Sequence, residues 1–209
     1  MYRLMKYLSQ YQDFDNDSIL LIIDVQKSFS EFFTENYVKQ LKEYCRGFDK
    51  VYQIYDNHVE GKNPDKDYLY KKNPPSPVNG DLYKFPKQVD IIEKRYRYDV
   101  EIDFFKKELT TSMYKEIKSR EENDDIKVGE YFETKNGTIL VFINNNHNWF
   151  ECPVKLFNLL KEWKNKQIVI VGGADRECLT DVEVTAKSLG VKVKRNDNYI
   201  YSAQHCPIK

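Results

Sequence analysis

The chain has 209 residues, enough for one domain with a substantial core or for one domain with an elaboration. Its 33 Lys and Arg balance its 33 Asp and Glu, so no basic surplus points to nucleic acid or an anionic membrane. The chain has no apolar run near the roughly 20 residues that span a bilayer and no paired cysteine spacing. Polar residues interrupt its first segment too early for a secretory h-region, so we expect no secretory leader. We therefore expect a soluble, cytoplasmic protein with reduced thiols that binds neither nucleic acid nor membrane.

The N-terminal half predicts three strands, with a helix between the first two. Residues 18–24 form a continuous apolar run that ends in an acid, a pattern typical of a strand buried on both faces of a parallel sheet. Apolar residues at helical spacing predict a helix within 31–45, and a second strand follows over 50–58. Residues 61–87 hold five of the seven prolines and predict a loop before a third strand over 88–96.

The C-terminal half continues the alternation of helices and strands. An apolar stripe predicts a helix over 101–120, and Asn136-Gly137 predicts a type I′ turn in a β-hairpin over 129–145. Four further elements are expected, namely a helix from Pro153 through Trp163, a strand over 167–173, a helix from Cys178 to a C-cap at Gly190, and a last strand over 191–197.

This alternation predicts an α/β fold, an open and mostly parallel sheet with helices on both faces. Ligands of such sheets bind beyond the carboxyl ends of the strands. The residues at those ends are Asp24, Asp56 with His58, Lys94, and Cys178. We expect the binding site to be built from them.

Cys178 is the candidate nucleophile because it follows a strand and a glycine turn at the expected first turn of a helix. A helix N-terminus and a nearby lysine both favour the thiolate, so the pKa of this thiol is expected below its free value of about 8.5. An acid can take the thiol proton or pass it to a leaving group, and backbone N–H groups of the turn can form an oxyanion hole.

Three segments resemble the isochorismatase-like cysteine hydrolases, a family that includes nicotinamidases. The segment "LLIIDVQKSF" resembles the first strand with its catalytic aspartate, which implies Asp24. The segment "VIVGGADRECLTDVEVTAKSLGVKVKRND" resembles the nucleophile segment, which implies Cys178, and "IIEKRYRY" resembles the lysine strand, which implies Lys94. The resemblance implies one isochorismatase-like hydrolase domain over residues 1–209.

The same resemblance implies further parts of the site. It implies a cis peptide between Gly173 and Ala174, with the amides of Ala174 and Cys178 as oxyanion donors. It also implies substrate contacts from Phe29.

Two other positions are candidates for substrate binding or metal. The segment "YDNH" resembles the Asp-x-His pair with which nicotinamidases bind a metal, which implies Asp56 and His58. Two ligands are fewer than a stable transition-metal site needs, so we expect no cofactor, and a divalent metal held loosely if at all. Both residues are then expected to bind substrate, together with Trp149, which follows the predicted hairpin.

The position of the lysine leaves two alignments open. Lys94 lies 84 residues before Cys178, whereas one β-α-β unit needs only about 30 residues, so an inserted helix and hairpin are expected at about 99–140. A rival alignment places "TILVFINNNHNWF" on the lysine strand, with Asn144 where the lysine should be.

These alignments lead to two function hypotheses. With Asp24, Lys94 and Cys178 together, the protein is a cysteine-dependent hydrolase of a small amide or related C–N bond that works through an acyl-enzyme. With Asn144 at the lysine position, it is a catalytically silent relative that serves binding or assembly. In either case the expected partner is a small molecule, and the sequence leaves room for a homo-oligomer.

Overall fold

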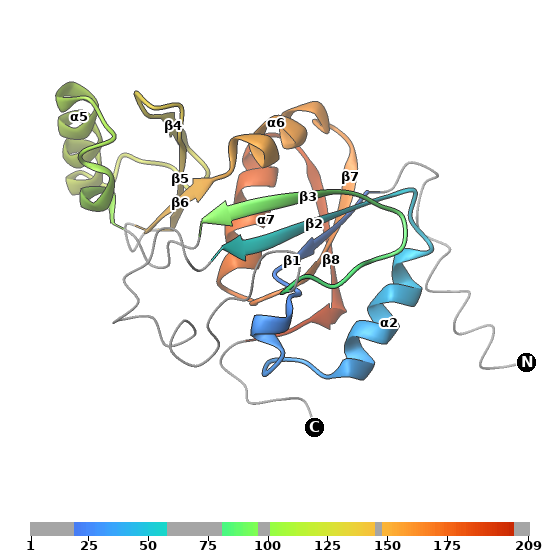
Figure 1. Ribbon diagram of the computed structural model, residues 1–209. Coiled ribbons are helices and arrows are strands. Elements are labelled where there is room, and N and C mark those ends of the chain that lie inside the picture. The colour runs from blue at the N-terminus through green and yellow to red at the C-terminus, as the bar shows by residue number, and fades with distance from the viewer. Residues whose placement is uncertain (1–18, 58–80, 96–100, 145–147, 203–209) are drawn as a thin grey trace, which may run out of the picture.

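The computed structural model describes residues 19–57, 81–95, 101–144 and 148–202 (Figure 1). Its helices and strands, with η marking 3-10 helices, are β1 (Ile19–Ile23), η1 (Lys27–Phe29), α2 (Glu35–Cys45), β2 (Lys50–Asn57), β3 (Gln88–Arg95), η2 (Ile102–Phe105), α5 (Thr111–Glu122), β4 (Tyr131–Glu133), β5 (Ile139–Asn144), β6 (Asn148–Cys152), α6 (Val154–Glu162), β7 (Gln167–Gly172), α7 (Cys178–Ser188) and β8 (Lys192–Ile200). No helix among the described residues is long and apolar enough to cross a membrane.

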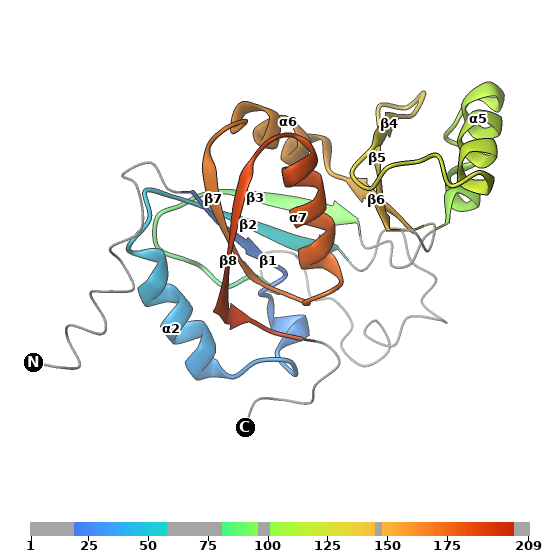
Figure 2. The same ribbon diagram turned by 180° about the vertical axis from the view of Figure 1, so that it is seen from behind.

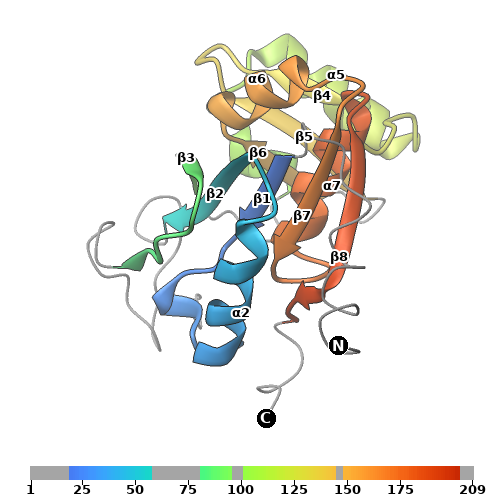
Figure 3. The same cartoon turned by 90° about the vertical axis from the view of Figure 1, so that its right-hand side faces the viewer.

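The main sheet has five strands in the order β3-β2-β1-β7-β8 (Figure 3). Every neighbouring pair in it is parallel. The central strand, β1, is apolar along its whole length, and all five of its residues are buried. Such a run suits the middle of a parallel sheet, because both faces of the strand are covered by other elements. The predicted α/β fold with an open parallel sheet is thus confirmed.

Helices cover both faces of this sheet, as expected. On one face Leu20 and Ile22 of β1 share a core with Leu41 of α2. On the other face Leu21 and Ile23 share a core with side chains of α6 and α7. Since consecutive side chains of a strand point to opposite faces, β1 supplies both cores and fixes the two layers of helices relative to each other.

A smaller unit lies beyond the carboxyl ends of β2 and β3 (Figures 1 and 2). It consists of η2, α5 and an antiparallel sheet in the order β4-β5-β6. Its own core includes Phe105, Ile117 and Trp149. The expected insertion at about 99–140 falls in this region, and its bounds stay a prediction.

Two local predictions in this unit were wrong. The helix expected over 101–120 is divided into η2 and α5, because the side chain of Thr110 caps α5 by accepting a hydrogen bond from the N–H of Met113. The turn at Asn136-Gly137 is not type I′, which needs a positive φ at both residues, whereas Gly137 has one and Asn136 does not. The hairpin itself is present, and a third strand, β6, extends it.

Candidate active site

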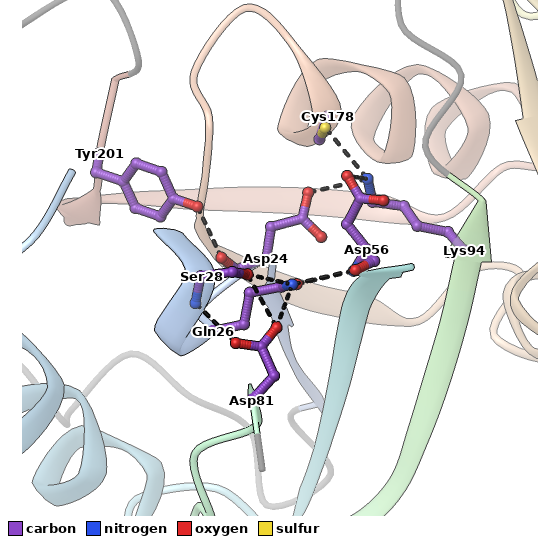
Figure 4. A network of polar contacts seen from close by, with 8 residues as sticks. All are labelled: Asp24, Gln26, Ser28, Asp56, Asp81, Lys94, Cys178 and Tyr201. Atoms are coloured by element: carbon purple, nitrogen blue, oxygen red, sulfur yellow. Dashed lines mark hydrogen bonds and ion pairs between the residues drawn. The ribbon is translucent and has the colours of Figure 1, made fainter. Parts of the chain in front are cut away.

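The side chains of Asp24, Lys94 and Cys178 meet at one end of the main sheet (Figure 4). The ammonium Nζ of Lys94 lies 2.9 Å from Oδ2 of Asp24 and 3.2 Å from Sγ of Cys178. All three side chains are buried, with 3% of the Lys94 side chain exposed to solvent. A carboxylate, an ammonium and a thiol thus form one compact group shielded from water.

The strands and α7 bring these residues together from three distant parts of the sequence. Asp24 follows β1 directly and has a positive φ of 54°, while its N–H still bonds to Ile54 O of β2 at 2.9 Å. Lys94 is near the end of β3, and Cys178 is the first residue of α7, where the sequence predicted it. All three therefore lie at carboxyl ends of parallel strands or just beyond them.

The glycine turn between β7 and α7 is shaped by two close contacts. Gly172 has φ of +99°, and a Cβ there would lie 2.0 Å from the carbonyl oxygen of Ile23. A Cβ at Gly173 would lie 2.6 Å from Cε2 of Tyr201. A larger residue would not fit at either position. Because both are glycines, the turn can pass close to β1, and Cys178 lies beside Asp24. The peptide between Gly173 and Ala174 is cis, as the resemblance implied.

Asp56 adds a second carboxylate to the group. Its Oδ2 lies 3.5 Å from Nζ of Lys94, and the acidic groups of Asp24, Asp56 and Cys178 lie within 4.8 Å of one another. Such a set could ligate a metal ion, but Lys94 Nζ already lies within 3.5 Å of all three groups. A metal bound by the same atoms would have to displace this ammonium.

The electrostatics of the group differ from the expectation for the thiol. Burial lowers the pKa of Lys94, but the charges of Asp24, Asp56 and Cys178 raise it well above its usual value, so the lysine stays protonated. Burial raises the pKa of Cys178 well above its usual value; the charge of Lys94 lowers it in part, and the carboxylates of Asp24 and Asp56 raise it further. The predicted low thiol pKa was therefore wrong, since the sequence did not show how deeply this group is buried.

Two backbone N–H groups, one in the turn after β7 and one at the start of α7, bear on the binding of an anion. Within the described part of the chain, no group accepts a hydrogen bond from the N–H of Ala174 or of Cys178. Cys178 begins α7, so its N–H also carries the positive end of the helix dipole. These are the two donors that the resemblance implied for an oxyanion hole.

The other predicted site residues are placed differently. Phe29 is buried under α2 and packs near Phe32, and His58 lies outside the described residues. The expectation that Trp149 binds substrate is corrected. Trp149 is 2% exposed in the core of the smaller unit, and its indole N–H donates a hydrogen bond to Glu121 at 2.7 Å. It is a core residue, not a pocket wall.

The two alignments for the lysine position are also separated by the structure. Asn144 lies at the end of β5, in the three-stranded sheet, whereas β3 with Lys94 lies beside β2 in the main sheet. Lys94 is the side chain between Asp24 and Cys178.

Sequence reasoning missed several polar residues around the group. Gln26, Ser28 and Asp81 form a buried network, and the hydroxyl of Tyr201 donates to the backbone oxygen of Asp24 at 2.7 Å. Gln26 and Ser28 belong to the segment that carried the resemblance, but no local pattern links them to Asp81, 55 residues from Gln26.

Comparisons with known proteins give one similar structure. No family model matches this sequence, and no curated protein matches it. A solved structure of a nicotinamidase from Staphylococcus aureus is similar, with 16% sequence identity and a TM-score of 0.38, over 90% of this chain and 87% of that chain.

Proposed function

We propose that the protein is a cysteine-dependent hydrolase that cleaves a small amide or a related C–N bond. The observation that carries this proposal is the position of Lys94 Nζ, 2.9 Å from Asp24 and 3.2 Å from the sulfur of Cys178. A buried acid, cation and thiol in mutual contact provide a base, a charge stabiliser and a nucleophile. The isochorismatase-like resemblance of the three segments points to the same reaction.

In the first half of the proposed reaction, Asp24 takes the proton of Cys178 as the sulfur attacks the substrate carbonyl. The raised thiol pKa means that the resting group is a neutral thiol, so a base must act during the attack. Lys94 stabilises the thiolate as it forms. The N–H groups of Ala174 and Cys178 stabilise the oxyanion, and the proton on Asp24 passes to the departing nitrogen.

In the second half, water releases the acyl group from sulfur. The amine has left with the proton from Asp24, so the carboxylate is free to deprotonate the attacking water. The C–S bond breaks, the thiol regains its proton, and a carboxylic acid leaves. The net reaction is an amide and water giving an acid and an amine, with no external cofactor.

The alternative of a silent binding protein depends on Asn144 in the lysine position. The placement of Lys94 in the group favours the enzyme over this alternative.

The test is ammonia or amine release from a panel of small amides and ureas, with Cys178→Ala as the inactive variant. We expect the replacement to lower turnover by several orders of magnitude, as is usual for the nucleophile of a catalytic unit. Cys45→Ala is the matched control, because Cys45 is a free, buried cysteine at the C-terminal end of α2 and its loss should leave turnover nearly unchanged. Turnover that survives in Cys178→Ala would contradict the proposal.

A further inference from the structure

A buried polar network adjoins the catalytic group (Figure 4). It consists of Gln26, Ser28 and Asp81, which are exposed by 0%, 8% and 4%. Gln26 and Ser28 follow β1, whereas Asp81 precedes β3. The network therefore ties two segments of the chain together next to Asp24 and Asp56. Buried polar groups of this kind are costly unless every one is paired, so the arrangement has a narrow geometry.

The side chain of Gln26 holds the backbone of Asp56 at two points. Its Oε1 accepts a hydrogen bond from the N–H of Asp56 at 2.8 Å, and its Nε2 donates to the carbonyl of Asp56 at 3.1 Å. The regular pairing of β1 with β2 ends at Ile23 and Ile54. The amide of Gln26 thus continues the pairing beyond the end of the regular ladder.

Asp81 supports the orientation of this amide that the backbone of Asp56 also requires. Its Oδ2 accepts from Nε2 of Gln26 at 2.8 Å and from Oγ of Ser28 at 2.9 Å, and its Oδ1 accepts from the N–H of Ser28 at 2.7 Å. A carboxylate can only accept, so it selects the nitrogen end of the amide. With the amide reversed, an oxygen would face the carboxylate, and a donor would face the N–H of Asp56.

We propose that Asp81 is a positioning residue that holds Asp56 against Lys94 through the side chain of Gln26. The chain of contacts runs from Asp81 to Nε2 of Gln26, from Oε1 of Gln26 to the N–H of Asp56, and from Asp56 to Lys94 at 3.5 Å. Lys94 in turn contacts Asp24 and Cys178. Asp81 touches none of the reacting atoms, so its influence is on their geometry.

The test is Asp81→Asn, which keeps the size of the side chain but presents an NH₂ group to Gln26 or Ser28. The amide of Gln26 then loses one of the acceptors that hold it in place, and it holds Asp56 less firmly against Lys94. For the hydrolysis that we propose, we expect kcat to fall roughly ten- to a hundredfold, with KM changed by no more than about twofold, because misplacement by about 1 Å costs this much in rate.

A second readout does not rest on the proposed function. Burial is the main cause of the raised pKa of Cys178, and the nearby charge of Asp56 adds to it, so displacement of Asp56 should move the pH midpoint of Cys178 alkylation downward. Mass-mapped alkylation of the intact protein over a pH series measures this. If no amide is hydrolysed even by the parent protein, the proposed function fails, and the alkylation midpoint still decides the role of Asp81.

Ser28→Ala is the matched control. It removes a hydroxyl that bonds to both Gln26 and Asp81 but leaves the contacts from Asp81 through Gln26 to Asp56 in place. We expect the parent kcat and alkylation midpoint within about twofold and a few tenths of a pH unit.

Two outcomes would overturn the proposal. One is a folded Asp81→Asn variant with the kcat and midpoint of the parent protein. The other is a failure of both Asp81→Asn and Asp81→Ala to fold, as measured by circular dichroism, although Asp81→Ala leaves room for a water molecule. Asp81 would then be a purely structural residue.

Discussion

The ammonium of Lys94 compensates the negative charge of the buried acidic groups. It is in contact with Asp24, Asp56 and Cys178, and 3% of the Lys94 side chain is exposed. Removing one partner from a buried ionic group leaves the others uncompensated and commonly costs about 3–5 kcal/mol.

We therefore predict that Lys94→Met lowers the free energy of unfolding by about 3–5 kcal/mol at neutral pH. The alkylation rate of Cys178 should fall as well, because the thiolate loses its cation. Thermal or urea unfolding measures the first effect, and mass-mapped alkylation measures the second.

The double variant Lys94→Met with Asp56→Asn is the control, since it removes one carboxylate together with the ammonium. It should recover part of the lost stability but none of the turnover. A single variant as stable and as reactive as the parent would exclude Lys94 from the ionic group.

Asp181 is a further titrating group, in the first turn of α7. Burial raises its pKa to about 7, with repulsion from Asp24 and Glu177 and against the attraction of Lys94. The folded state thus binds a proton that the unfolded state, with its ordinary carboxyl pKa, releases. Stability from this group is fully present below the unfolded pKa and is lost as pH rises through about 7.

We predict that Asp181→Asn raises Tm relative to the parent protein at about pH 8 but changes it little at about pH 4. The charge of Asp181 also raises the pKa of Cys178, so the same variant should alkylate faster at alkaline pH. Differential scanning calorimetry at the two pH values checks the first part. An equal shift in Tm at both values would mean that Asp181 keeps an ordinary pKa.

At the residue scale, sequence reasoning located the group but misjudged its environment. Asp24 and Cys178 could be predicted because each follows an apolar strand at a recognisable turn. Lys94 could be predicted from its strand, although Asn144 was the other candidate for the lysine position. The raised pKa of the Cys178 thiol could not be predicted, because it depends on how deeply three separate segments of the chain bury one another. Asp81 was hidden in a proline-rich stretch with no periodic signal.

At the scale of elements, strong periodicity predicted well and local turn chemistry predicted poorly. The buried run of β1 and the start of α7 at Cys178 were confirmed. In the smaller unit, the apolar stripe over 101–120 predicted the buried face but not the break at Thr110, since a hydroxyl cap overrides a continuous hydrophobic pattern. The strand β6 was missed because its polar first residue and short length give little alternation.

In the smaller unit, a buried hydrogen bond joins Trp149 of β6 to Glu121 of α5. We predict that Trp149→Phe destabilises this unit by about 1–3 kcal/mol, since it removes the donor to a buried carboxylate and part of the packed ring. Hydrogen exchange of α5 should increase. Alkylation of Cys178 should stay at the parent rate, and a large change in it would place Trp149 at the catalytic group after all.

At the scale of the whole molecule, the buried group of Asp24, Lys94 and Cys178 results from the order of the strands. Asp24, Lys94 and Cys178 are far apart in the sequence, and the order β3-β2-β1-β7 brings them to one end of the sheet. The order was not predicted, because apolar runs indicate that strands exist and not which strands are neighbours. It could be anticipated only through the resemblance.

The place of β1 in this order also has a consequence for biosynthesis. β1 pairs with β2 on one side and with β7 on the other, and β7 begins at Gln167. While the ribosome is still making the intervening segments, β1 can pair with β2 but keeps one apolar edge open. Open edges of this kind recruit other chains, so nascent chains that stop before Gln167 should need chaperones and should aggregate without them.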